Sequence, residues 1–253
     1  MLNYSIFLAK RELVNSIWKS AGIEGLGTTF PDTEAILENL PVTTRRDEVL
    51  FIVNMKRGWE FLFDNIEYPI TLSLLRELNK ITMVDLLYNA GEVRKGIVTI
   101  GGTTWTPEIP NEGVIISTLQ EILNNDDPLD VALDLFCYVA RTQIFTDGNK
   151  RLATLLANKY LIHNDIGILA VPYDRIKEFK ELLVCFYESN DSTKLKSFFK
   201  RYCIIYNPDY NSNFDAHKYL MNNPNYSMLP KASIDNCKTK ADCDALLERL
   251  SLK

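Results

Sequence analysis

Histidine, paired cysteines and long apolar runs are scarce in this sequence, and each shortage excludes a class of site or structure. Its 253 residues include only two histidines, His163 and His217, and neither lies in the motif described below. His163 is expected at the end of a helix, where the helix dipole favours a positive charge over a catalytic role. No run approaches the roughly 20 apolar residues of a membrane span, so no membrane partner is expected.

The five cysteines give no sign of a disulfide framework or a zinc site. Their number is odd, and Cys137, Cys185 and Cys203 fall in apolar helical surroundings, where a buried thiol is common. Cys237 and Cys243 are close in sequence, but no second pair or histidine follows at zinc-ligand spacing. The first nine residues are apolar but lack the basic start of a signal peptide. A reducing, cytoplasmic location is therefore expected.

The sequence also lacks a basic surface and several well-known catalytic loops. It has 28 Lys and Arg against 33 Asp and Glu, a formal charge of −5, and no dense basic run. Nucleic acid is therefore not expected as a partner, although an acidic protein can still bind a nucleotide locally. Neither the glycine-rich Lys-Ser/Thr loop of P-loop NTPases nor the strand-linked nucleophile turn of serine hydrolases occurs.

Apolar residues recur at three- and four-residue spacing through most of the chain, which predicts a mainly α fold. We expect N-terminal helices in residues 1–45, a core domain in 46–206 and a loop-rich extension in 207–253, where Asn, Asp and Pro become frequent. A short helix opens near Thr29. The other predicted helices cover about residues 5–21, 46–64, 71–88, 112–123, 128–141, 149–163, 173–189, 192–206 and 239–250.

Residues 91–106 interrupt the helical pattern. Two β-rich pieces, Ile97–Ile100 and Thr103–Trp105, are joined by the glycine pair at 101 and 102, which predicts a β-hairpin. The hairpin is either a packed structural element or one whose free edge accepts an extended peptide by main-chain hydrogen bonds.

The stretch from residue 143 to residue 151 lies between two strongly apolar predicted helices. Gly148 lets the backbone turn closely, so the free amides at the start of the second helix point outward with the positive end of its dipole. With Lys150 and Arg151 beside them, these amides predict an anion site, and the carboxylate of Asp147 suits Mg²⁺. The sequence Asp147-Gly148-Asn149 is equally compatible with a plain turn between two helices.

This stretch resembles the Fic/Doc family signature, HPFxDGN(G/K)R. The residues in common are Phe145, Asp147, Gly148, Asn149, Lys150 and Arg151. Three positions depart from the family pattern: Gln143 replaces the catalytic histidine, Ile144 replaces the usual proline, and Thr154 replaces a second arginine. The resemblance covers roughly residues 16–206 and leaves the C-terminal extension unexplained. It implies a Fic-like helical bundle with a small β-hairpin flap.

The family resemblance also implies ligands. Fic enzymes typically transfer AMP from ATP to a Ser, Thr or Tyr hydroxyl of a target protein, and the Doc branch transfers a phosphoryl group. ATP and Mg²⁺ are thus the implied cofactors, with Asp147 as the metal ligand. The implied phosphate-binding residues are Thr146, Gly148, Asn149, Lys150 and Arg151. The implied flap that docks the target protein comprises Val98, Thr99, Ile100, Gly101 and Gly102.

A second family pattern, the inhibitory sequence (S/T)xxxE(G/N), is matched by Ser20, Glu24 and Gly25. In the family this glutamate pairs with the second motif arginine and blocks productive placement of the ATP γ-phosphate. Here Thr154 stands in place of that arginine, so the usual partner of Glu24 is missing. Taken alone, these residues show only a helix that ends at glycine and a carboxylate near its end.

Gln143 changes the expected chemistry, because an amide has no titratable site near neutral pH and cannot take the proton of an attacking hydroxyl. The loss of a general base costs about 10² to 10⁴ in rate. Three hypotheses follow. The first is weak AMP transfer in which Gln143 only orients the acceptor, and it ranks slightly ahead of a non-catalytic, nucleotide-responsive protein-binding module. The third is removal of AMP from a protein, with Glu24 as the base.

Overall fold

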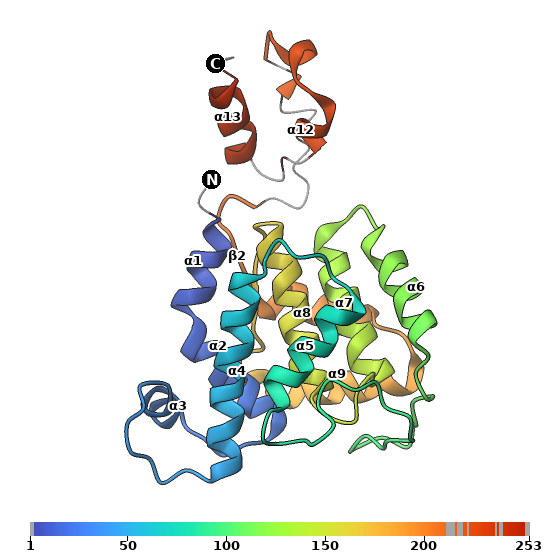
Figure 1. Ribbon diagram of the computed structural model, residues 1–253. Helices are drawn as coiled ribbons and strands as arrows, with labels where there is room; N and C mark the ends of the chain where they lie inside the picture. The colour runs from blue at the N-terminus through green and yellow to red at the C-terminus, as the bar shows by residue number, and fades with distance from the viewer. Residues whose placement is uncertain are drawn as a thin grey trace.

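The computed structural model describes residues 3–210, 216, 220–221, 223–235, 237 and 240–250. The mainly α fold is confirmed (Figure 1). The described helices are α1 (Tyr4–Arg11), α2 (Leu13–Glu24), α3 (Phe30–Leu37), α4 (Arg46–Asp64), α5 (Leu72–Met83), α6 (Glu112–Leu123), α7 (Pro128–Thr142), α8 (Asn149–His163), α9 (Ile176–Ser189), α10 (Thr193–Phe198), α12 (Lys231–Asp235) and α13 (Lys240–Arg249). The short elements are a 3₁₀ turn at Tyr173–Arg175, a π turn at Phe199–Cys203, a 3₁₀ turn at Tyr226–Met228 and strands β1 (Gly167–Leu169) and β2 (Ile204–Tyr206).

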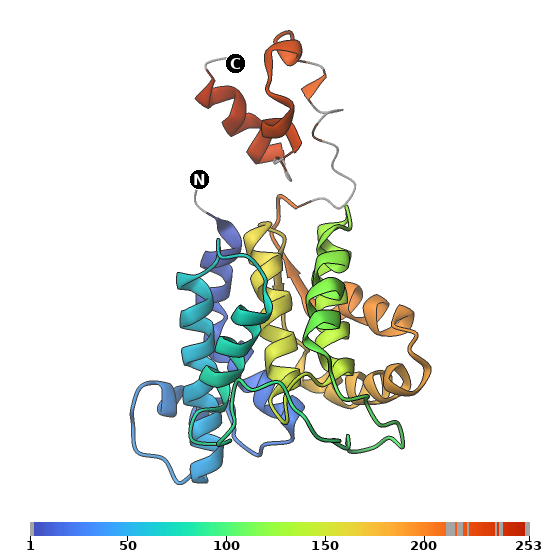
Figure 2. The ribbon, with the colours of Figure 1, turned by 45° about the vertical axis from the view of Figure 1, so that its right-hand side comes forward.

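Helix α8 lies at the centre of the bundle and is buried along almost its whole length. Helices α1, α2 and α4 lie to one side of it and α7 to the other (Figures 1 and 2). Helix α7 begins as the sequence predicts: Pro128 takes the first helical position, and the carboxylate of Asp127 accepts hydrogen bonds from the amides of Leu129 and Asp130. The turn between α7 and α8 is thereby held between two rigid core elements.

The small sheet pairs β1 with β2 in antiparallel register, with Ile168 opposite Ile205. It packs against α8 and α1. Asn158 on α8 fixes β1, because its amide oxygen accepts from the Leu169 amide at 2.8 Å and its nitrogen donates to the Leu169 carbonyl at 2.9 Å. The two strands lie far apart in sequence and are not the predicted hairpin.

The hairpin predicted at residues 97–105 does not form. These residues carry no strand pairing, and the nearest pairing is an isolated bridge between Val93 and Phe145. The turn at Gly101 and Gly102 is present, but an isolated two-stranded hairpin is only marginally stable in water. Trp105 stacks on the ring of Tyr187 instead, at 6.0 Å between centroids. The segment is thus an irregular loop, and its role in target docking stays a prediction.

Three other predictions are corrected by the structure. The single helix expected at 5–21 is two helices that break at Glu12, and α2 continues through Gly22 to Glu24. The helix expected at 71–88 ends at Met83, and residues 84–86 form a turn. The last part of the helix expected at 192–206 is strand β2, since its β-branched and aromatic residues pair with β1. Helix α13 lies where the final helix was expected, but its predicted cap, Thr239, falls outside the described residues.

The buried apolar side chains of the described residues form two separate clusters. The larger includes residues from α1 to the π turn at Phe199–Cys203, and helices α1–α3 contribute to it directly. The smaller consists of residues after 210, including Leu220, Ile234 and Leu246. Cys137 and Cys203 are buried as predicted, whereas Cys185 is exposed on α9. No helix among the described residues is both long and apolar enough to cross a membrane.

Candidate functional site

Gln143 ends α7 in a left-handed conformation, with φ 50° and ψ 60°. Its side chain is held by two hydrogen bonds within the turn. The amide nitrogen donates to the Ala140 carbonyl at 2.6 Å, and the amide oxygen accepts from the side chain of Asn149 at 3.0 Å. Both ends of the amide are therefore engaged inside the protein.

Asn149, the first residue of α8, shapes the turn from within. Its side chain is almost fully buried, accepts from the Phe145 amide at 3.0 Å and donates to the Phe145 carbonyl at 2.8 Å. The side chain of Asn149, which the family resemblance assigns to phosphate binding, is thus engaged in hydrogen bonds that hold the turn. What Asn149 can offer to an anion is its backbone amide at the start of the helix.

Gly148 caps α8 with φ 79°, a conformation that favours glycine. A Cβ at this position would lie 2.7 Å from the Met83 sulfur, so α5 leaves no room for a side chain. No side chain caps α8, and the first amides of the helix remain available at the positive end of its dipole. This is the geometry of an anion site.

Asp147 and Thr146 lie on the exposed outer side of the same turn. One carboxylate oxygen of Asp147 accepts from the Gly148 amide at 2.6 Å, and the other lies 3.8 Å from Arg151. The hydroxyl of Thr146 accepts a hydrogen bond from Asn89 at 3.2 Å. Within the described ranges, no group of three or more His, Cys, Asp or Glu residues could hold a metal. The single carboxylate of Asp147 still fits Mg²⁺, which usually takes one or two protein carboxylates together with phosphate oxygens.

Glu24 reaches this turn from the end of α2. Its carboxylate lies 3.0 Å from the Lys150 amine and 3.7 Å from the Arg151 Nε, and its side chain is 17% exposed. Gly25 ends α2 in a left-handed conformation, which leaves Glu24 as the last helical residue. Thr154 stands where the family pattern has the arginine that pairs with this glutamate. In this structure Glu24 pairs with Lys150 instead. Ser20 does not contact the turn, because its hydroxyl donates to the Ser16 carbonyl within α2.

Arg151 is buried and anchored toward α4 and α5. Its Nη1 donates to the Thr82 carbonyl at 3.3 Å and contacts the Met83 sulfur at 2.8 Å. Its guanidinium lies 4.9 Å from the centre of the Phe51 ring. Of the two basic residues in the motif, Lys150 is the more exposed and the better placed to meet an anion.

Sequence reasoning missed Asn79 and Arg94, two buried polar residues that hold the turn. Asn79 is fully buried, donates to the Asp147 carbonyl at 2.9 Å and accepts from the Gly91 amide at 2.8 Å. It therefore ties α5 both to the turn and to the start of the 91–106 loop. No motif marks this residue, and only the three-dimensional structure shows what it contacts.

Arg94 connects the same loop to the end of α7. It donates to the carbonyls of Gln143 and Glu108, both at 2.5 Å, and to the carbonyl of Gly96 at 2.7 Å. Its burial lowers the pKa of the guanidinium. The positive charge of Arg94 also interacts favourably with the negative end of the α7 helix dipole. Arg94 thus holds together both ends of the 96–108 segment and the backbone of Gln143.

Comparison with known proteins identifies a family match and similar solved structures. Residues 69–161 match the Fic/DOC family model, and no curated protein matches the chain. The chain has the Fic fold. Fic-1 from C. elegans shares 18% identity with a TM-score of 0.65, covering 97% of this chain and 66% of that one. A Glu-to-Gly variant of Fic-1 shares 19% identity with a TM-score of 0.64. This match covers 77% of this chain and 62% of that one.

A third solved structure, a Fic domain containing signaling protein from Bacteroides thetaiotaomicron, shares 20% identity with a TM-score of 0.61. The match covers 70% of this chain and 72% of that one. The chain spans less than two thirds of the length of both C. elegans structures, at 62% and 66%. The stretch matched by the family model, residues 69–161, includes the α7–α8 turn described above.

Proposed function

We propose that this chain binds ATP at the α7–α8 turn and transfers AMP slowly to a hydroxyl group of a target protein. One observation carries the proposal: the N-terminus of α8 has no side-chain cap and lies between the exposed carboxylate of Asp147 and the amine of Lys150. Free helix amides and a nearby amine bind phosphate, and the match to the Fic/DOC family model over residues 69–161, which include this turn, supports the proposal.

The residues of the turn then have distinct tasks. The backbone amides of α8 bind phosphate oxygens, and Lys150 adds positive charge when it is released from Glu24. Asp147 would hold Mg²⁺, which supplies charge neutralisation on the phosphates when bound. Electrostatic stabilisation and positioning of this kind retain part of a catalytic rate even without a general base.

The side chain of Gln143 explains why transfer is slow. It cannot accept the proton of an attacking hydroxyl, and its amide is already bonded to Ala140 and Asn149. Before it could even orient an acceptor, one of these hydrogen bonds would have to break. The same observation favours a second candidate, a nucleotide-responsive binding module without catalysis.

Glu24 adds a restraint on nucleotide binding under this proposal. Its carboxylate forms an ion pair with the Lys150 amine at 3.0 Å and lies near Arg151. It therefore competes with an incoming phosphate for the same positive charge. Replacement of Glu24 by glycine is expected to increase both nucleotide binding and labelling. If it instead abolishes removal of AMP from a labelled target, Glu24 acts as the base of the reverse reaction.

The deciding experiment uses ATP labelled at the α-phosphate, Mg²⁺ and a cell lysate. We expect the Gln143→His variant to label proteins about 10² to 10⁴ times faster than the native chain, since a general base contributes that much. Gln143→Ala is the control, because it removes the amide without supplying a base. Equal labelling by the native chain and the histidine variant contradicts the general-base argument. Nucleotide binding without labelling by either protein favours the binding module.

A further inference from the structure

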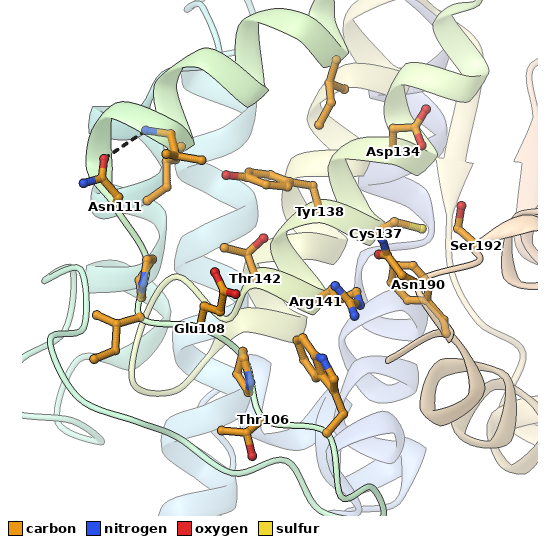
Figure 3. A pocket seen from close by; sticks show the side chains of 18 residues that line it. Thr106, Glu108, Asn111, Asp134, Cys137, Tyr138, Arg141, Thr142, Asn190 and Ser192 are labelled. Atoms are coloured by element: carbon orange, nitrogen blue, oxygen red, sulfur yellow. Dashed lines mark hydrogen bonds between the residues drawn. The ribbon is translucent and has the colours of Figure 1, made fainter. Parts of the chain in front are cut away.

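A cavity of about 640 Å³ lies next to the end of α7 that leads into the candidate active site (Figure 3). Its walls come from the loop at residues 105–111, from α6 and α7, and from the end of α9 with the residues that follow it. None of residues 143–151 lines it, so it is separate from the turn that holds the family motif. Its size is typical of a small-molecule site, about 300 to 1,000 Å³.

Among the described residues that line this cavity, Arg141 is the only lysine or arginine. Its guanidinium lies 4.2 Å from the centre of the Trp105 ring, and its Nε donates to the Tyr187 carbonyl at 3.2 Å. In the part of the chain that the structure describes, no carboxylate lies within 4.0 Å of its nitrogens. The terminal nitrogens of the guanidinium thus remain available, and Figure 3 shows Arg141 between Glu108 and Asn190 in the lining.

The acidic groups of the lining do not neutralise this guanidinium. Asp134 is paired with Lys196 at 2.6 Å, and Glu108 lies on the exposed rim. Burial raises the pKa of Tyr138, so its phenol stays neutral. Burial lowers the pKa of Arg141 itself, but an arginine remains charged at neutral pH. Inside the cavity, Arg141 is therefore the one positive group without an acidic partner among the described residues.

The remaining wall combines polar side chains with an apolar part that includes Pro107, Ile109, Ile115 and Phe186. A guanidinium that is stacked on an indole keeps its planar fork free for a carboxylate, which it binds through two parallel hydrogen bonds. Apolar walls around one oriented cation select a ligand with an apolar body and one negative end. We propose that this cavity binds a small organic carboxylate with an aromatic or aliphatic body.

The test compares binding of two matched probes, 3-phenylpropanoate and its neutral amide, to the full chain by isothermal titration calorimetry. We expect the carboxylate to bind about tenfold or more tightly than the amide, because hydrogen bonds to a charged group supply such a factor. The Arg141→Gln variant is expected to lose this preference. Arg175→Gln is the matched control, since Arg175 also stacks on an aromatic ring, Tyr202 at 3.7 Å, but does not line the cavity.

A second variant tests the cavity itself without changing Arg141. Val114 lines the cavity at its rim and is 58% exposed, so Val114→Trp fills the space with little effect on the core. Loss of carboxylate binding in Val114→Trp, with circular dichroism unchanged, supports the site. Equal affinity for the carboxylate and the amide overturns the proposal. No detectable binding of the carboxylate, or unchanged binding in both variants, also overturns it. None of these measurements uses ATP, so they do not depend on the proposed AMP transfer.

Discussion

At the scale of single residues, the turn between α7 and α8 depends on Gly148. Gly148→Ala is expected to destabilise the protein by about 1–3 kcal/mol, because a side chain at φ 79° is strained and its Cβ would lie 2.7 Å from the Met83 sulfur. Urea unfolding measures this change. Gly96→Ala is the control, since nothing lies within 4 Å of a Cβ there. Equal effects of the two substitutions would show that α5 does not confine the turn.

The buried amine of Lys159 makes the free energy of unfolding depend on pH. Its amine donates to the Ile66 carbonyl at 2.6 Å, and burial lowers its pKa from 10.5 to about 8, although nearby Glu67 acts in the opposite direction. Below pH 8 both the folded and the unfolded chain carry the proton, so the folded state bears the full cost of the buried charge. Between pH 8 and 10.5 the unfolded chain binds more protons, and stability rises with pH.

Lys159→Met isolates this contribution, because it fills the same space without a titratable group. We expect the stability of the variant relative to the native chain to fall as pH rises from 8 to 10, by at most about 1.4 kcal/mol per pH unit. Denaturant unfolding at several pH values gives the comparison. A difference between the two proteins that stays constant over this range would contradict the depressed pKa.

Residue-scale chemistry was only partly readable from the sequence. The family motif predicts an anion site at the α7–α8 turn and a departure from the family pattern at Gln143, since both depend on residues that are adjacent in the chain. The ion pair between Glu24 and Lys150 was not predicted, because the usual partner position holds Thr154 and no local pattern shows which cation replaces it. Asn79 and Arg94 gave no signal, because a buried polar residue is defined by its partners and not by its neighbours in sequence.

At the scale of elements, Arg94 is the link between the 96–108 segment and α7. Arg94→Met removes the hydrogen bonds that Arg94 donates to the carbonyls of Gly96, Glu108 and Gln143, and each such bond contributes about 0.5–1.5 kcal/mol. We therefore expect faster amide hydrogen exchange in residues 96–108, with α8 still protected. Lys95→Met is the control, because its side chain is on the exposed side of the same stretch.

Exchange that stays slow in the Arg94→Met variant would show that the segment is held by other contacts, such as the hydrogen bond between Thr103 and Glu188 at 3.0 Å. Unfolding of the whole protein would instead show that Arg94 supports the core. Only a change confined to the 96–108 segment identifies Arg94 as the residue that positions this loop against the turn.

The elements that the sequence predicted well are those whose signals are local. Helices α4 and α6 match the predicted ranges 46–64 and 112–123, and Asn111 caps α6 by accepting from the Val114 amide at 3.2 Å. Strand β2 was assigned to a helix because its pairing with β1 is a long-range event. The 97–105 segment has strand composition but lacks a third strand that would stabilise pairing.

At the scale of the whole molecule, the bundle encloses its core without the residues that follow Tyr210. The main cluster ends with the π turn at Phe199–Cys203, partly buried Tyr210 packs against it, and the buried side chains after 210 pack among themselves. Figures 1 and 2 show α12 and α13 beyond the end of the bundle at which α1 begins. From the sequence, a change in composition predicts a loop-rich extension at residues 207–253, but composition alone could not show the apolar cluster among the described residues after 210.

Truncation after Tyr210 is therefore expected to leave the thermal unfolding midpoint of the bundle unchanged within about 2 °C, since less than about 1 kcal/mol is lost. Truncation after Cys203 is the matched comparison. It removes β2 and the hydrogen bonds of Asn207 to Ile166 and Asp165, and exposes β1. At roughly 1 kcal/mol for each hydrogen bond, a loss of a few kcal/mol lowers the midpoint by about 10 °C. A similar fall in both truncated chains would mean that the tail stabilises the bundle, and that the two clusters fold as one unit.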